Sequence, residues 1–171
     1  MKSRLLLLSD LFGGKETEWI KQYRYLLESK FDTQYYDVLK LANISVSDLT
    51  EMDIHNQFLN GGIDKAVENL LKLEKEKTAV LGFSIGGTIA WKAALKGLKV
   101  SHLIAVSSTR LRHETQFPNC EIKLFFGEND PNKPKPEWFS DLKIPYQILK
   151  NQNHQLYLQK SQASLICSEF N

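Results

Sequence analysis

The chain has 171 residues, of which 42% are hydrophobic and 25% are charged. These proportions are ordinary for a globular protein, and the length predicts a single domain spanning residues 1–171. The 22 basic and 20 acidic side chains nearly balance, with a net charge of +2. Such a balance gives no reason to expect nucleic acid or a membrane surface as a partner.

The run of leucines from Leu5 to Leu8 follows a basic start. A signal peptide needs roughly seven or more apolar residues, so we interpret this run as a buried strand. No stretch approaches the ~20 apolar residues of a membrane span. Cys120 and Cys167 are the only cysteines, and they form neither a disulfide framework nor a metal-ligand spacing. We therefore expect a cytoplasmic protein with no metal and no cofactor.

Apolar runs of strand length alternate with amphipathic runs of helix length along the chain. Residues 43–53 are predicted to be irregular, and residues 110–119 are too short and polar for a full helix. In chain order, the pattern predicts a strand over 5–9, a helix over 16–29, a strand over 33–39, a helix within 55–73, a strand over 79–81, a helix over 88–95, strands over 100–107 and 122–126, a short helix over 137–142, a strand over 146–149 and a closing helix over 155–170. This alternation predicts an α/β fold, a three-layer α/β/α sandwich with a mostly parallel sheet of about six strands.

The segment Gly82-Phe83-Ser84-Ile85-Gly86 matches the pattern G-x-S-x-G between a predicted strand and a predicted helix. This is the setting of a nucleophile elbow, a sharp turn that strains the serine and exposes its oxygen. The residues two positions away must be small because strand and helix nearly touch there, and Gly82 and Gly86 meet that need. The turn also aims the Ile85 amide where it can bind an oxyanion. The alternative is a glycine-rich turn with an ordinary serine.

An acidic residue and a histidine follow two later predicted strands. Asp130 comes after the strand over 122–126, and His154 comes after the strand over 146–149. Because the carboxyl ends of parallel strands share one edge of a sheet, we expect both side chains near Ser84. A serine hydroxyl needs an adjacent base, and a histidine held by a carboxylate supplies one.

With these motifs and this residue order, the chain resembles a compact α/β-hydrolase. The segments that carry the resemblance are Gly82-Phe83-Ser84-Ile85-Gly86, Gly127-Glu128-Asn129-Asp130 and Asn153-His154. The strand and helix order matches from about residue 5 to the C-terminus, without the two leading antiparallel strands and without an inserted lid. The resemblance implies a minimal α/β-hydrolase fold with no cap domain, in which Ser84, His154 and Asp130 are the catalytic nucleophile, base and acid.

Each assignment has competitors. Glu128 lies in the same loop as Asp130, which could itself simply begin a turn. Among the other histidines, His55 and His102 fall beside predicted helix or strand elements, which favours structural or exposed roles. His113 follows the strand over 100–107 but precedes the acid in the chain, against the order expected for the family.

The resemblance also implies an oxyanion hole that combines the Ile85 amide with one from the loop after the first strand. Similar enzymes place a His-Gly pair in that loop, where this chain has Ser9-Asp10-Leu11-Phe12-Gly13-Gly14. We expect Leu11 to be the second donor, with Phe12 next. Phe12, Arg110 and Arg112 are candidate substrate-binding residues; the arginines would suit an anionic or polar group, or simply belong to a solvated loop.

These features predict a serine hydrolase that works through a covalent acyl-enzyme on a small-molecule ester or thioester, most simply a carboxylesterase. The same triad also serves amidases, peptidases and acyltransferases. A member of another class, a non-catalytic binding or interaction module of the same fold, is a further alternative. The sequence indicates neither the substrate nor the oligomeric state.

Overall fold

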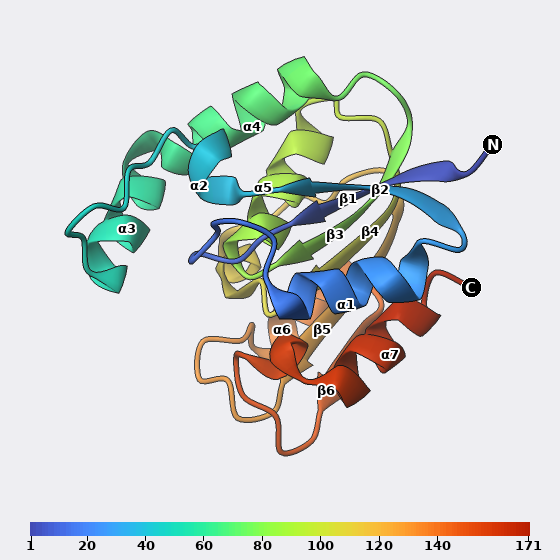
Figure 1. The fold of residues 1–171 in the computed structure, drawn as a ribbon. Coiled ribbons are helices and arrows are strands. Elements are labelled where there is room, and N and C mark those ends of the chain that lie inside the picture. The colour runs from blue at the N-terminus through green and yellow to red at the C-terminus, as the bar shows by residue number, and fades with distance from the viewer.

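The centre of the molecule is a sheet of six parallel strands, seen in a computed structural model that describes all residues 1–171 (Figure 1). The strands are β1 (Ser3–Leu8), β2 (Phe31–Tyr36), β3 (Thr78–Phe83), β4 (Val100–Val106), β5 (Glu121–Gly127) and β6 (Tyr146–Leu149). Their spatial order is β2-β1-β3-β4-β5-β6, and every neighbouring pair is parallel. The chain therefore places β2 on one side of β1 and the later strands on the other. This reversal opens a crevice outside the carboxyl ends of β1 and β3.

Both faces of the sheet are covered, so both alternating sets of strand side chains are apolar. Leu5 and Leu7 of β1 belong to a buried cluster with α1 (Glu18–Leu27) and α7 (Lys160–Ser168). Leu6 and Leu8 belong to the cluster on the opposite face. That face is covered by α2 (Val38–Leu41), α4 (Ile63–Leu73), α5 (Ile85–Leu95) and α6 (Pro136–Leu142).

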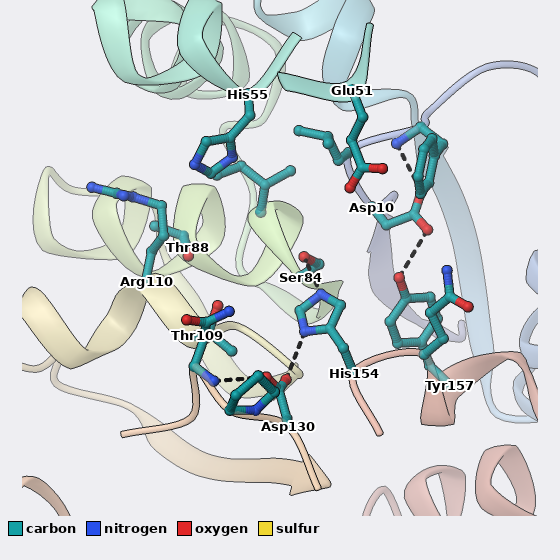
Figure 2. Close-up of a pocket in the computed structure, with 16 residues that line it drawn as sticks. Asp10, Glu51, His55, Ser84, Thr88, Thr109, Arg110, Asp130, His154 and Tyr157 are labelled. Carbon is teal, nitrogen blue, oxygen red and sulfur yellow. Dashed lines mark hydrogen bonds and ion pairs between the residues drawn. The ribbon is translucent and has the colours of Figure 1, made fainter. Parts of the chain in front are cut away.

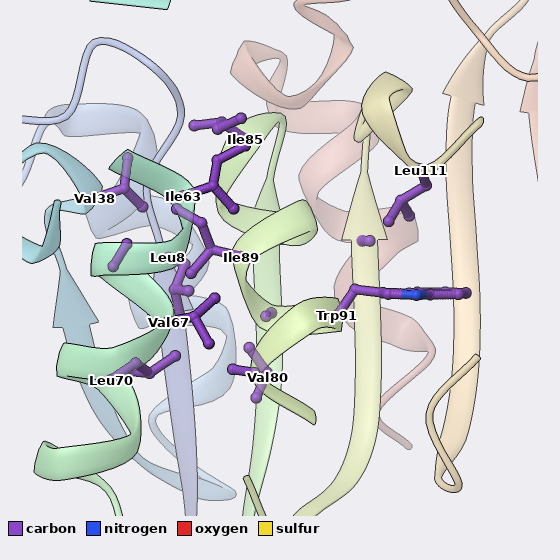
Figure 3. Packing of buried hydrophobic residues seen from close by; sticks show 14 of the residues in the cluster. Leu8, Val38, Ile63, Val67, Leu70, Val80, Ile85, Ile89, Trp91 and Leu111 are labelled. Carbon is purple, nitrogen blue, oxygen red and sulfur yellow. The ribbon is translucent and has the colours of Figure 1, made fainter. Parts of the chain in front are cut away.

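The packing between α4, α5 and the sheet is close. Figure 3 shows Val67 of α4 and Ile89 of α5 meeting Leu8 of β1 and Val80 of β3, and all four side chains are fully buried. Such burial fixes α5 against the strands that flank its first turn. No cap domain interrupts the chain. None of the helices combines the length and the apolar character that crossing a bilayer requires.

The α/β sandwich and the presence of all six strands were predicted correctly, and four segments depart from the predicted boundaries or elements. The predicted strand over 33–39 ends at Tyr36, because the Asp37 side chain accepts the Leu39 amide and begins α2. Helix α5 begins at Ile85, ahead of the predicted residue 88. The predicted closing helix over 155–170 is divided into a 3-10 turn, η3 (Leu156–Leu158), and α7.

A further helix, α3 (Glu51–Gln57), begins inside the segment predicted to be irregular. Its start is a capping box, in which Thr50 and Asp53 bind each other's backbone amides. This pattern was visible in the sequence and should have indicated a helix start. A non-helical kink at Asn60 and Gly61, where φ of Gly61 is 106°, separates α3 from α4.

An ion pair and a tyrosine tie the amino-terminal end of the sheet to the end of α4. Arg4 donates two hydrogen bonds of 2.8 Å to the two carboxylate oxygens of Glu74, and the Tyr36 hydroxyl donates a third. Glu74 is only 5% exposed. Burial raises the pKa of Glu74, but the hydrogen bonds from Arg4 and Tyr36 outweigh it, so the pKa lies below its ordinary value. The carboxylate is therefore ionised at neutral pH.

We predict that Glu74→Ala lowers the free energy of unfolding by about 2–4 kcal/mol, because it removes both hydrogen bonds of a partly buried guanidinium and leaves it only the exposed Asp32 at 3.8 Å. The control is Asp64→Ala, which breaks an exposed pair of 3.5 Å with Lys96 and should cost less than about 0.5 kcal/mol. Urea unfolding at neutral pH measures both. A loss for Glu74→Ala as small as the control's would contradict the prediction.

Because of the Glu74 carboxylate, we also expect the free energy of unfolding to depend on pH. Since its folded pKa is lowered, the stability it contributes is present above its ordinary value of 4.5 and is lost as the pH falls through the folded pKa. The difference in unfolding free energy between wild type and Glu74→Ala should therefore shrink below pH 4.5. A difference that stays constant into this range would count against the assigned protonation state.

Candidate active site

Ser84 stands at the sharp turn between β3 and α5. Its φ of 52° and ψ of −120° lie in a region that residues with a Cβ rarely adopt. The backbone is held there by the Ser84 amide, which donates to the Val106 carbonyl, and by the Ser84 carbonyl, which accepts the Gly87 amide. The side chain is partly exposed and lines a pocket. A strained serine held in this way is typical of a functional site.

The turn is possible because glycines flank it. A Cβ added to Gly82 would lie 2.6 Å from the Cα of Gly87, so β3 and α5 nearly touch there. A Cβ added to Gly86 would lie 2.3 Å from the Ser9 carbonyl oxygen and 2.7 Å from that of Leu8. The predicted need for small residues is thus correct, and the structure adds that Gly86 packs against the end of β1, rather than against its own strand.

Ser84, His154 and Asp130 form one hydrogen-bonded chain, although they come from three separate loops (Figure 2). The Ser84 Oγ lies 3.0 Å from the His154 Nε2, and the His154 Nδ1 lies 2.6 Å from the Asp130 Oδ2. Asp130 is 1% exposed, and the His154 side chain is 37% exposed. This order joins a hydroxyl to an imidazole and the imidazole to a buried carboxylate.

The loops that carry Asp130 and His154 are held against each other because β5 and β6 are neighbours. The Asn129 amide donates to the Gln152 carbonyl over 2.8 Å. A Cβ on Gly127 would lie 2.4 Å from the same carbonyl oxygen, so only glycine allows this approach. The backbone thereby fixes the separation of the acid and the histidine.

Asp130 is ionised at neutral pH. Burial raises the pKa of its carboxyl, but the hydrogen bond from His154, the Asn132 amide and the charge of Lys133 outweigh burial, and the pKa is lowered. An ionised carboxylate at Nδ1 places the proton on that nitrogen and leaves Nε2 free to accept a proton from Ser84.

The competing residues lie elsewhere. Glu128 accepts the Asn151 amide and makes no contact with His154. His102 pairs with Glu121 at the start of β5, away from the carboxyl edge, and His113 is exposed. His55 is different, because it lies on α3 and lines the pocket.

Two backbone amides close to the serine have no acceptor within the chain, those of Ile85 and Leu11. The neighbouring Phe12 amide donates to the Asp10 Oδ1, and the Gly13 amide donates to the Asp10 carbonyl. Of the two predicted candidates for the second oxyanion donor, Leu11 therefore has the free amide. Ile85 and Leu11 both line the same pocket as Ser84.

The pocket has a volume of about 400 Å³ and contains most of the predicted site residues (Figure 2). Phe12 and Arg110 line it, whereas Arg112 does not. Arg112 instead donates to the Thr109 carbonyl of its own 3-10 turn, η2 (Thr109–His113). Nine further lining residues were not predicted as site residues, and they include Asp10, Glu51, His55, Thr88 and Tyr157.

Asp10 connects the first-strand loop to the last part of the chain. Its Oδ2 accepts a hydrogen bond of 2.9 Å from the buried hydroxyl of Tyr157. Burial raises the pKa of Asp10, although the bonds from Tyr157 and from the Phe12 and Gly13 amides oppose that shift. Its position directly after β1, at the carboxyl edge, was the sequence signal that could have indicated it.

The whole chain superposes on solved structures of one fold. A protein from Xanthomonas campestris assigned as a hydrolase of the alpha/beta superfamily matches with a TM-score of 0.73 and 15% identity over 99% of this chain and 98% of that one. The chain has the α/β-hydrolase fold. A carboxylesterase structure from the thaumarchaeon Nitrososphaera gargenis matches with a TM-score of 0.67 and 15% identity, over 99% of this chain and 90% of the other.

Another similar α/β-hydrolase structure is a dienelactone hydrolase-like promiscuous phosphotriesterase, P91, from metagenomic libraries. It has a TM-score of 0.72 and 14% identity, over 99% of this chain and 85% of that one. The sequence itself matches no family model and no curated protein. The similarity is therefore one of α/β-hydrolase architecture.

We predict that Gly86→Ala lowers the free energy of unfolding by about 3 kcal/mol or more, because the new Cβ collides with backbone that cannot move independently. The control is Gly97→Ala, where φ is 111° but no atom lies within 4 Å; backbone strain alone should cost about 1–2 kcal/mol. Urea unfolding of both variants compares them. Equal losses would show that the contact between α5 and the end of β1 is not a tight constraint.

Proposed function

We propose that this protein is a serine hydrolase that cleaves a small ester or thioester, with carboxylesterase-like chemistry. The observation that carries the proposal is the chain of hydrogen bonds from Asp130 through His154 to Ser84, which ends on a strained serine at the first turn of a helix. The architecture shared with hydrolases and carboxylesterases supports it. A pocket of about 400 Å³ suits a small substrate.

In the proposed reaction, the Ser84 Oγ attacks the carbonyl carbon while the His154 Nε2 accepts the hydroxyl proton. The carbonyl oxygen becomes an oxyanion, and the free amides of Ile85 and Leu11 are the donors that stabilise it. The tetrahedral intermediate collapses, the bond to the leaving oxygen or sulfur breaks, and His154 returns the proton to that atom. The products of this half-reaction are an alcohol or thiol and an acyl ester on Ser84.

Water completes the cycle by the same steps. His154 takes a proton from the water as its oxygen attacks the acyl carbon, and then returns the proton to the Ser84 oxygen as the acid departs. Asp130 stays ionised throughout; it orients the imidazole and stabilises its charged form. No step needs a further reactant.

We predict that Ser84→Ala and His154→Ala reduce kcat for 4-nitrophenyl acetate and butyrate by about 10³–10⁶-fold, and that Asp130→Asn reduces it by about 10³–10⁴-fold. The matched control is Glu128→Gln, which changes the neighbouring acid that does not contact His154 and should keep activity within about 2-fold of wild type. Initial rates and thermal unfolding of each variant measure activity and folding separately.

Labelling with a fluorophosphonate probe extends the test. Wild type should be labelled at Ser84, and Ser84→Ala should not. A folded wild type that is neither labelled nor active on any ester or thioester would overturn the proposal and favour a binding module. A labelled wild type that cleaves only amides, or that transfers its acyl group to added alcohols or amines, would preserve the triad and change the reaction class.

A further inference from the structure

Three polar side chains that the proposed hydrolysis does not use line the active-site pocket: Thr88 of α5, Arg110 of η2 and His55 of α3. Figure 2 shows Arg110 beside Thr88, with His55 above them. None of the three forms a side-chain hydrogen bond or ion pair within the chain, yet all three are at least partly buried. Partly buried polar groups without partners require an explanation.

Arg110 is exceptional among the four arginines. Arg4 and Arg24 pair with glutamates, and Arg112 donates to a backbone carbonyl. Arg110 has no such partner. The nearby acid Glu114 forms a 2.7 Å ion pair with Lys92. A guanidinium remains charged in a protein, so Arg110 brings an uncompensated positive charge to the pocket wall.

The Thr88 hydroxyl is buried, and the residue is 1% exposed. A threonine inside a helix often donates to the carbonyl four residues earlier. Here that carbonyl belongs to Ser84 and accepts the Gly87 amide instead. The hydroxyl therefore has no hydrogen-bond partner within the chain, and Thr88 lines the same pocket as Arg110.

His55 of α3 adds a third donor, above Arg110 and Thr88 in Figure 2. Burial lowers the pKa of its imidazole, the charges of Arg110 and Arg112 lower it further, and the charge of Glu51 opposes them. The ring is neutral at pH 7 and has one N–H to donate.

The other side of the pocket carries the opposite charge. Figure 2 shows Glu51 and Asp10 on the side away from Arg110. Asp10 already accepts bonds from Tyr157 and Phe12. An anionic group is thus repelled from that side and attracted to the wall of Arg110, Thr88 and His55.

We propose that this wall binds a free carboxylate on the substrate, so that the enzyme prefers esters or thioesters that carry a second, ionised carboxyl group. The inference rests on the proposed function and deepens it. A carboxylate carries one negative charge, which the single guanidinium neutralises, and its oxygens can accept the Thr88 and His55 donors. A doubly charged phosphate would leave one negative charge that the single guanidinium does not neutralise.

The carboxylate can belong to either half of the substrate, and two pairs of esters separate the possibilities. 4-Nitrophenyl hemiglutarate carries it on the acyl side, and 4-nitrophenyl butyrate is its neutral counterpart. 4-Acetoxybenzoate carries it on the leaving group, and methyl 4-acetoxybenzoate is neutral. For wild type we expect kcat/KM to be at least about 10-fold higher for the charged ester in one of the two pairs.

The variant that tests the wall is Arg110→Gln. The ratio of kcat/KM for the charged ester to kcat/KM for its neutral counterpart should fall by about 10–100-fold. Arg112→Gln is the matched control: it removes the same charge from the same 3-10 turn, but Arg112 does not line the pocket. The ratio of the two kcat/KM values for Arg112→Gln should stay within about 3-fold of the wild-type ratio, because the half-buried Arg112 does not line the pocket and its charge is partly screened by salt.

Thr88→Val provides a second measurement that does not depend on charge. Valine matches threonine in shape, so the ratio should fall by about 3- to 10-fold while the Tm does not fall, since an unpartnered buried hydroxyl has been removed. A lower Tm together with an unchanged ratio would show that the hydroxyl serves the fold alone.

Failure of this inference is distinct from failure of the proposed function. Suppose that a fluorophosphonate labels Ser84 and that neutral esters are cleaved. If the enzyme then prefers the charged ester in neither pair, and Arg110→Gln leaves both kcat/KM ratios unchanged, the carboxylate site is overturned and the proposed hydrolase function stands. If Ser84 is not labelled and no ester is cleaved, both are overturned.

Discussion

The contact between the first turn of α5 and the end of β1 is the constraint on which the rest of the site depends. Gly86 lies against the carbonyls of Leu8 and Ser9, so the helix begins directly beside the loop that follows β1. The free amides of Ile85 and Leu11 consequently face one pocket. The strain at Ser84 opposes this arrangement, and the burial of α5 between α4 and the sheet offsets it, since Ile89, Trp91 and Ala93 are completely buried.

Much of the fold was predictable because its physical signals are local. A strand buried on both faces needs a continuous apolar run, and this chain has such runs at the places where β1, β3, β4 and β5 occur. Two of the errors occurred where a polar side chain decides the outcome. Asp37 stops β2 by capping α2, and Thr50 begins α3 in a stretch with few apolar residues. Capping hydrogen bonds also form between residues close in sequence, but the spacing of hydrophobic residues does not reveal them.

The candidate site likewise has a part that the sequence predicts and a part that it does not. Ser84, Asp130 and His154 each follow a predicted strand, so the rule that parallel strands end at one edge was enough to bring them together. The Asp10–Tyr157 bond joins residues 147 positions apart, and nothing near either residue indicates the other. The pocket wall likewise depends on the position of α3, which the kink at Asn60 and Gly61 separates from α4. Orientation of this kind follows from packing, which a single sequence does not display.

The order of the three residues along the chain has a consequence for biosynthesis. Ser84 directly follows the central strand β3, whereas its hydrogen-bonding partner His154 follows β6, a strand at the edge of the sheet. A ribosome therefore exposes the serine well before it makes the histidine. Under the proposed mechanism, a nascent chain that has folded as far as β4 holds a serine without its base, and the hydrogen bond between Ser84 and His154 forms only when the last edge strand docks. The topology thus delays assembly of the proposed site until the sheet is closed on that side.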